Sequence, residues 1–344
     1  MSSAGTDIII PVWNNPTETR ECLAALVEHS GDFRLILLDI GSDQPTEQLL
    51  HEFAEYLDSR ALLLRSESAR SFVSTVNRGL SKAEAPFAVV MRSTSRVTAG
   101  WLEPFQEAAL RPDAGILVPR LYSSGATLSP KKMRERPAGE ALYGSFSALG
   151  ITRGLYAAIG DFDEGLDGDV WCLKDYSRRA DQAGFRTLRL AGPPIQYREV
   201  TPYGSVARRE KIVNESIATY TERWGTEQMF CSFFAPGTDQ ETLRKAFDSM
   251  LTAARRGHHF FVFAPQPVFR MILSSSLHLL HDAILVEKLP SIFPLRACRA
   301  AFARLRGSYR DIRILIGLDG FLDLEGEKGV TFAEFEKSIA TTEV

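Results

Sequence analysis

Cysteine is scarce in this sequence, and no two cysteines have the spacing of a metal or redox motif. The 344 residues contain four of them, Cys22, Cys172, Cys231 and Cys298. A disulfide framework or a zinc site needs paired or clustered cysteines, so the sequence disfavours both. We expect reduced thiols, as in a cytoplasmic protein.

Long apolar runs and a strong net charge are missing as well. No uninterrupted apolar stretch reaches the roughly 18 residues of a membrane span, and the start of the chain lacks the basic and apolar regions of a signal peptide. The net charge is only −3, so no global positive field points to nucleic acid. The sequence therefore predicts a cytoplasmic protein and leaves peripheral association with a membrane open.

Short β-rich runs alternate with helical patterns in the first half of the chain. Strands are expected at Asp7–Trp13, Arg34–Asp39, Ala61–Arg65, Phe87–Met91 and Gly115–Pro119. Single helices between them imply crossover connections and a mostly parallel α/β sheet. Such sheets bind ligands outside the carboxyl ends of their strands. No GxGxxG follows the first strand, which disfavours a dinucleotide-dependent oxidoreductase.

The last third of the chain has the spacing of helices. They are expected at 239–256, 267–287, 294–306 and 332–340. We therefore predict two domains, an α/β domain at 1–235 and a small helical domain at 236–344.

Seven segments in order carry a resemblance to the family 2 glycosyltransferases, which have the GT-A fold. They are Asp7–Asn15, Leu35–Asp43, Ala69–Leu80, Phe87–Phe105, Ile159–Leu166, Tyr176–Leu188 and Ala218–Gly225. Each segment alone is weak, but their order over about 220 residues is specific. The resemblance implies a Rossmann-like sheet that binds a nucleotide sugar.

The resemblance also implies residues for the nucleotide. The expected donor-binding set is Pro11, Trp13 and Asn14 at the base and ribose, Asp39 at the base, and Arg70 and Asn77 near the base and phosphates. The alternatives are a core aromatic at Trp13, a helix-surface amide at Asn77 and an Asx-turn residue at Asp39. The order of the motifs favours binding for Asp39.

The segments that would hold a metal ion in the family differ in this sequence. Where the family has acids, this sequence has Ser93-Thr94-Ser95-Arg96, and the family's later histidine is missing from 196–199. Mg²⁺ and Mn²⁺ prefer carboxylates, so a metal in the usual place is disfavoured. Either Arg92 and Arg96 stabilise the diphosphate instead, or the site does not catalyse transfer.

The general base has two candidates by resemblance. One alignment leaves Asp175 near the family's catalytic acid, and one extra helical turn places Asp169 there. Such a carboxylate would accept the proton of the acceptor hydroxyl. Both residues could instead be helix-start acids that the helix dipole favours. Asp163 and Glu164 match the acceptor segment of the family.

Two features of the last third suggest further contacts. The stretch 294–313 is basic and amphipathic, which is typical either of a helix on an anionic membrane or of one packed on its domain. A weak EF-hand-like pattern, and with it a weak calcium site, is formed by Asp323, Glu325, Glu327 and Glu334. Lys328 stands where the loop needs glycine, and an acidic turn explains the pattern equally well.

Two functions follow. The first is a glycosyltransferase, as in polysaccharide biosynthesis, that moves a hexosyl or deoxyhexosyl group from a nucleotide sugar to a glycan, lipid-linked or protein acceptor without the usual metal motif. The alternative is a catalytically inactive glycosyltransferase-like scaffold. In either case the C-terminal domain is the expected surface for a homo-oligomer or a protein partner.

Overall fold

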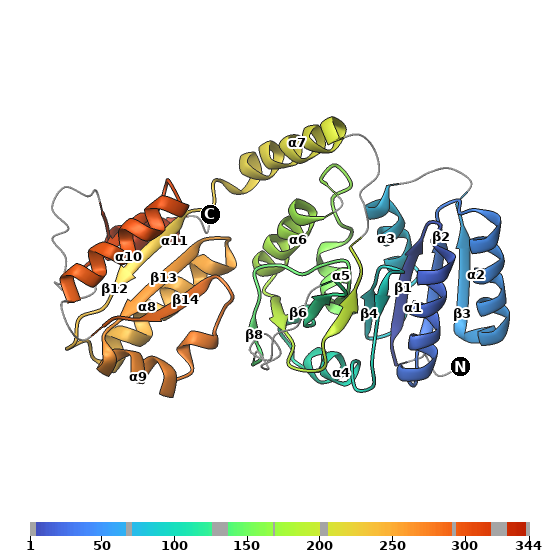
Figure 1. Cartoon of the computed structure of the whole chain (residues 1–344), viewed down its shortest axis with the longest axis horizontal. Helices are drawn as coiled ribbons and strands as arrows, with labels where there is room; N and C mark the ends of the chain where they lie inside the picture. The colour runs from blue at the N-terminus through green and yellow to red at the C-terminus, as the bar shows by residue number, and fades with distance from the viewer. Residues whose placement is uncertain are drawn as a thin grey trace. The chain divides into compact units, whose positions relative to one another are not determined.

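The chain folds into two compact units. In this computed structural model the described residues are 5–66, 71–125, 137–167, 169–199, 206–290, 294–317 and 329–341. The units are Met1–Trp224 and Gly225–Val344 (Figure 1). Their division lies before the predicted boundary at 235, because the strand that follows Gly225 pairs within the second unit.

The first unit begins with a strand and ends with a long helix. Its first part has β1 (Asp7–Val12), α1 (Pro16–His29), β2 (Arg34–Asp39), α2 (Gln44–Leu57), β3 (Ala61–Arg65), α3 (Phe72–Leu80), β4 (Phe87–Val90), β5 (Ser95–Arg96) and α4 (Glu103–Ala109). Its second part has β6 (Ala114–Val118), β7 (Leu121–Ser123), β8 (Gly139–Glu140), β9 (Leu149–Thr152), α5 (Arg153–Ile159), α6 (Val170–Gln182), β10 (Arg186–Arg189), β11 (Ile195–Tyr197) and α7 (Val206–Trp224).

The described strands of this unit form a sheet in the order β3-β2-β1-β4-β9-β6-β10-β8. The strands β1 to β4 run parallel, as predicted, while β9 runs antiparallel to β4 and β6. A smaller sheet has the order β5-β11-β7. The α/β class with a mostly parallel sheet is therefore confirmed.

Both faces of the large sheet are buried, so its central strands are apolar throughout. Ile8 and Ile10 pack with α1, α2 and α4 on one face, whereas Ile9 packs with α3, α5 and α6 on the other. Gly79 lets α3 approach β1 closely, since a Cβ there would lie 2.4 Å from Cγ2 of Ile9. This approach places the start of α3 beside the carboxyl ends of the strands.

The second unit is also an α/β sheet, so the prediction of a helical domain is wrong. Its elements are β12 (Met229–Phe233), α8 (Gln240–Arg255), β13 (His259–Ala264), α9 (Gln266–Ser274), β14 (Ile284–Lys288), α10 (Pro294–Ser308), β15 (Arg313–Ile316), β16 (Val330–Thr331) and α11 (Phe332–Thr341). Its described strands are parallel, in the order β14-β13-β12-β15-β16.

The error has a physical cause. A strand buried on both faces is a short continuous apolar run, and periodicity cannot distinguish such a run from a piece of buried helix. The predicted helix at 267–287 therefore merged α9 with β14. The predictions at 239–256, 294–306 and 332–340 correspond to α8, α10 and α11 and are confirmed.

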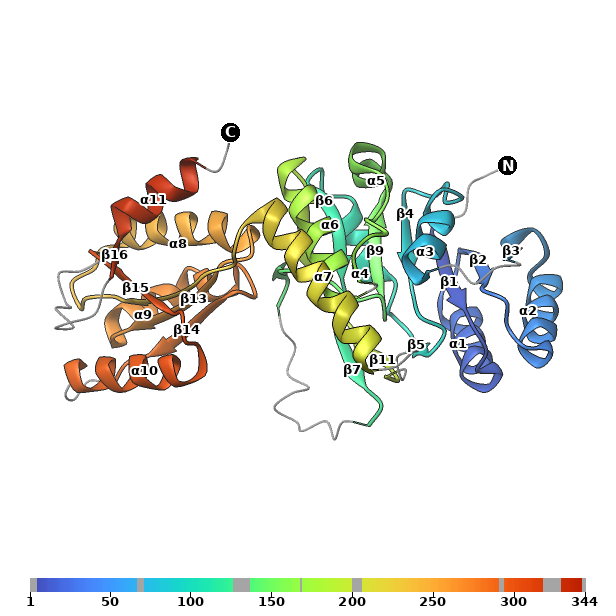
Figure 2. The same cartoon turned by 90° about the horizontal axis from the view of Figure 1, so that it is seen from above.

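Layers of helices cover this second sheet. Helices α8, α9 and α11 pack on one face, and α10 packs on the other (Figure 2). All four cysteines of the chain are buried. Within the described ranges, no helix is both long and apolar enough to span a bilayer.

Candidate donor and acceptor site

The carboxyl ends of β1 and β2 are fastened to each other by polar contacts. Ser42 Oγ accepts a hydrogen bond from the backbone N–H of Asn14 at 3.0 Å, and Oδ1 of Asn14 accepts one from the N–H of Asp43 at 2.8 Å. Asn14 adopts a left-handed backbone with φ of 55°, which asparagine tolerates better than most residues. Pro11 is buried inside β1, while Trp13 is 36% exposed at its end.

Asp39 lies at the end of β2 with one carboxylate oxygen anchored. Its Oδ1 accepts the backbone N–H of Ser42 at 2.8 Å, while its Oδ2 lies 3.7 Å from Nε of Arg65, beyond hydrogen-bond range. Arg65 also pairs with Glu47 of α2. Asp39 is thus both the Asx-turn residue of the alternative interpretation and a carboxylate with one oxygen left to accept a further donor.

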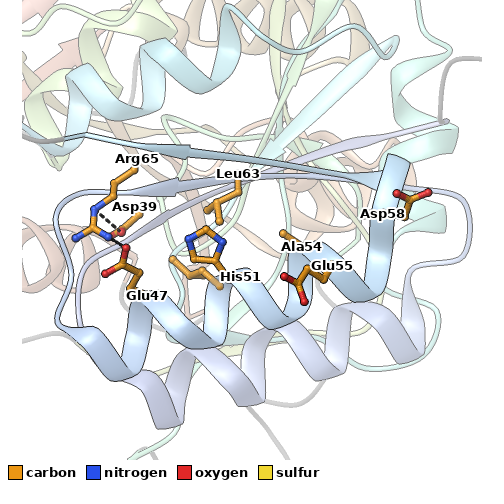
Figure 3. A pocket seen from close by; sticks show the side chains of 9 residues that line it. Asp39, Glu47, His51, Ala54, Glu55, Asp58, Leu63 and Arg65 are labelled. Atoms are coloured by element: carbon orange, nitrogen blue, oxygen red, sulfur yellow. Dashed lines mark ion pairs between the residues drawn. The ribbon is translucent and has the colours of Figure 1, made fainter.

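A groove begins at this carboxylate and follows α2 along the edge strand β3. It has a volume of about 340 Å³, and Asp39, Glu47 and Arg65 stand at one end of it (Figure 3). Further along, His51 of α2 faces Leu63 of β3, and Glu55 and Asp58 follow (Figure 3). The carboxyl-end residues of β2 and β3 therefore open onto a concave surface.

Asn77 does not face this groove. Its Nδ2 donates to the carbonyl of Phe162 at 2.9 Å and to Oε1 of Glu164 at 3.1 Å, and its Oδ1 accepts the N–H of Phe162 at 2.9 Å. These bonds tie α3 to the segment after α5. Both the nitrogen and the oxygen of the Asn77 side chain therefore form hydrogen bonds within the protein, which indicates a structural role.

The two positions where the family would hold a metal do lie together. The N–H of Arg198 donates to the carbonyl of Thr94 at 3.2 Å, and the hydroxyl of Thr94 donates to the carbonyl of Arg198 at 3.1 Å. The side chain of Arg198 pairs with Glu18 at 2.6 Å. A hydroxyl and a guanidinium do not fit Mg²⁺ or Mn²⁺, and among the described residues no group of three His, Cys, Asp or Glu side chains could hold a metal ion.

Arg92, at the end of β4, is a mostly buried cation. Its guanidinium carbon lies 4.4 Å from the centre of the Phe72 ring at the start of α3. None of the described residues accepts a hydrogen bond from its side chain. Burial lowers the pKa of Arg92, and the nearby carboxylate of Asp169 works in the opposite direction. An arginine remains charged at neutral pH even so.

Two acidic residues, Asp167 and Asp169, precede α6 and have different environments. Asp167 is 9% exposed and caps the helix, because its Oδ1 accepts the backbone N–H groups of Trp171 at 2.8 Å and Cys172 at 3.2 Å. Burial raises the pKa of Asp167, against the effect of these hydrogen bonds. Asp169 is exposed and makes no side-chain cap bond. Asp167, rather than Asp169, therefore caps the start of α6 with its side chain.

Asp175 lies at the centre of a buried network. Its carboxylate is 0% exposed and accepts hydrogen bonds from Arg179 at 2.8 Å, Arg223 at 2.5 Å and the indole of Trp224 at 2.9 Å. Arg223 also donates to Asp163 at 2.8 Å. Burial would raise the pKa of Asp163, but the bonds from Arg223 and Gly165 hold it below its ordinary value of 3.8. This network joins α6 to α7, and it leaves Asp175 no route to an acceptor.

The remaining predicted residues lie apart from this site or beyond the described chain. Arg96 is exposed on β5. Glu334, from the calcium pattern, instead caps α11: its Oε2 accepts both the N–H and the hydroxyl of Thr331, at 2.9 and 2.8 Å. The other residues, Arg70, Asp323, Glu325 and Glu327, lie outside the described residues.

The sequence did not point to several residues of the site. Among them are Glu47, Arg65, Phe72 and Asp167. Asp167 had a local signal, since an Asp just before an apolar helical pattern indicates an N-cap. The contacts of Arg65 and Phe72 depend on neighbouring strands, which spacing along the chain does not reveal.

Comparisons with known proteins find similarity in sequence and in fold. Residues 7–162 match the sequence model of glycosyl transferase family 2. GalNAc-T7 with UDP, GalNAc and Mn²⁺ superposes with a TM-score of 0.52 at 13% identity, over 64% of this chain and 49% of that chain. The match thus spans about half of that protein. A comparison with curated protein sequences gives no match.

Two further solved structures are similar at a lower level. The mannosyltransferase PcManGT from Pyrobaculum calidifontis, in complex with GDP-Man and Mn²⁺, has a TM-score of 0.48 at 15% identity, over 88% of this chain and 80% of that one. S. aureus TarS 1-349 has a TM-score of 0.46 at 14% identity, over 73% and 80%. The first unit has the GT-A glycosyltransferase fold. Residues 7–162 are similar to glycosyl transferase family 2, and Ser93-Thr94-Ser95-Arg96 stand where that family would have its metal-binding acids.

Proposed function

We propose that the protein transfers a sugar from a nucleotide-sugar donor, and that Arg92 rather than a metal ion neutralises the leaving diphosphate. The observation that supports this proposal most strongly is the environment of Arg92. Its guanidinium is mostly buried and lies over the ring of Phe72, and none of the described residues accepts a hydrogen bond from it. A buried cation without an acceptor is costly. An incoming phosphate would remove that cost.

The guanidinium suits this role chemically. Its planar fork of N–H donors matches two phosphate oxygens at once, which an ammonium group cannot do. Its place at the carboxyl end of β4 is where a sheet of this kind binds its ligand. A fixed cation aimed at the developing charge performs the electrostatic work that a metal performs elsewhere.

The nucleoside would bind at the ends of β1 and β2. The Oδ2 of Asp39 accepts no hydrogen bond from the described residues and is ion-paired with Arg65 at 3.7 Å, so it can accept an N–H of the base at the end of the groove lined by Arg65 and Glu47. Trp13 is exposed enough to cover the base or ribose. The proposed donor-binding set is therefore Asp39, Trp13, Asn14 and Arg92.

The acceptor would meet Asp169. This carboxylate is exposed, is not used as a cap, and lies close enough to Arg92 to favour its charged form. In the proposed step the acceptor hydroxyl oxygen bonds to the anomeric carbon while Asp169 takes its proton. The bond from that carbon to the diphosphate breaks, and the negative charge passes to the oxygens that Arg92 holds. The acceptor is a glycan, a lipid-linked sugar or a protein.

A second candidate is a scaffold that binds the nucleotide sugar without turnover. The observation that favours it is the enclosure of Asp175, which leaves Asp169 as the remaining one of the two base candidates. In this case Arg92 would still bind the diphosphate. The two functions therefore share the donor site and differ at the acceptor side.

Calorimetry and turnover separate these functions. The full chain is titrated with UDP-, GDP- and dTDP-sugars in EDTA, and donor hydrolysis or transfer is followed in the same buffer. Binding with turnover in EDTA supports the transferase, and binding without turnover under any condition supports the scaffold. Failure of every nucleotide sugar to bind, or turnover that strictly needs Mg²⁺ or Mn²⁺, would overturn the proposed donor site.

A further inference from the structure

Helix α10 of the second unit has two chemically different sides. Cys298, Phe302 and Leu305 are buried and pack against Phe261 and Ile314 of the second sheet. Of the two alternatives for this segment, packing on its own domain therefore accounts for the apolar side. The helix cannot also insert that side into a bilayer without leaving the core.

The opposite side of α10 is a row of arginines. This α10 basic face consists of Arg296, Arg299, Arg304 and Arg306, all exposed, and the helix contains no Asp or Glu. Arg304 pairs with Glu287 of β14 at 2.8 Å. Arg296 and Arg299 form no ion pair with any described residue. The whole chain carries −3, so this positive charge is concentrated locally rather than shared by the surface.

Two large apolar side chains flank the α10 basic face. Leu295, in the first turn of the helix, is 52% exposed. Leu285 of β14 is 50% exposed, and it lies on the same side of its strand as Glu287, the partner of Arg304. Exposed leucines beside a basic row are the composition of helices that lie at a membrane interface.

We infer that the α10 basic face docks the protein on an anionic lipid surface. The arginines meet the headgroup phosphates, Leu295 and Leu285 enter the boundary between headgroups and acyl chains, and the buried side of α10 keeps its contacts with the sheet. A soluble polyanion would satisfy the arginines but would leave both leucines in water. The leucines therefore favour lipid over nucleic acid or an acidic glycan.

The test is sedimentation of the full chain with vesicles. Phosphatidylcholine vesicles with phosphatidylglycerol should retain the protein at low salt, and vesicles of phosphatidylcholine alone should not. Each basic residue near an anionic membrane contributes about fivefold in partitioning, so Arg296→Gln with Arg299→Gln should weaken binding about 30-fold. Leu295→Ser should weaken it further, and high salt should abolish it.

A matched control removes the same charge elsewhere. Arg20→Gln with Lys82→Gln alters two exposed residues of the first unit and should leave vesicle binding unchanged. If the control variant lost vesicle binding to the same extent, net charge alone would explain the result and the inference would be overturned. Binding to heparin that matches vesicle binding and is insensitive to Leu295→Ser would also overturn it. Nucleotide-sugar binding is measured in parallel, and it should be the same in all variants, which separates this inference from the proposed function.

Discussion

Replacing Arg92 by methionine tests the donor site most directly. Methionine has a similar length and can keep the contact with the ring of Phe72, 4.4 Å from the guanidinium carbon, through a sulfur–aromatic interaction. It lacks the charge and the N–H donors. The variant therefore removes the proposed phosphate ligand and keeps most of the packing.

The expected loss of affinity follows from the bonds removed. A hydrogen bond to a charged group is worth about 1.5–3 kcal/mol, which corresponds to roughly 10- to 150-fold in Kd. A bidentate contact with a diphosphate should reach the upper end. Binding of the free nucleoside should not change, because Asp39 ends β2 and Trp13 follows β1, whereas Arg92 follows β4. Arg96→Met is the comparison variant, and it should cause little loss because Arg96 is exposed on β5.

The effect on folding should be small. The variant loses a cation–π contact of about 1–2 kcal/mol, but it also removes a buried charge whose lowered pKa reports an unfavourable environment. These contributions oppose each other, so the free energy of unfolding should change by no more than about 1 kcal/mol.

Calorimetry with nucleoside diphosphates and nucleosides, and urea unfolding without ligand, provide the two measurements. Unchanged diphosphate affinity in Arg92→Met would refute the role of Arg92 in the donor site. A loss of more than about 2 kcal/mol in unfolding free energy would show that the residue is needed for folding instead.

Three further substitutions test the roles of carboxylates near the proposed acceptor side. Asp169→Asn should lower kcat by about 10²- to 10⁴-fold with donor Kd unchanged; a normal kcat in a steady-state assay would exclude the base. Asp175→Ala should cost about 3 kcal/mol in urea unfolding, at the low end for a broken buried pair because Arg223 is 39% exposed; a stable variant with altered kcat would contradict the structural role. The lowered pKa of Asp163 contributes stability above its ordinary value of 3.8, and this contribution disappears as pH falls through the folded pKa. Asp163→Asn should therefore be less stable than the wild type at pH 7 and equal to it in strong acid, while a constant difference in unfolding at both pH values would refute the linkage.

Much of the first unit could be predicted because its signals are local. The runs at 34–39 and 61–65 are strands with the predicted bounds. The turn after β2 identified Asp39 in the same way, because the carboxylate at the start of this Asp-x-Gly-Ser turn accepts the backbone N–H of Ser42. The second sheet was not predictable from periodicity, since its apolar runs are as short and continuous as pieces of buried helix.

The roles of individual polar residues were decided only by tertiary structure. The family resemblance made Asp169 the first candidate for the base and Asp175 the second. Arg223, which is 48 residues from Asp175, holds Asp175 in a buried network. The same holds for Asn77, whose partner Phe162 is 85 residues away. Spacing along the chain determines which face of an element a side chain occupies. Whether that side chain finds a partner depends on residues that folding brings from elsewhere. For the side chain of Arg92, none of the described residues is a hydrogen-bond acceptor.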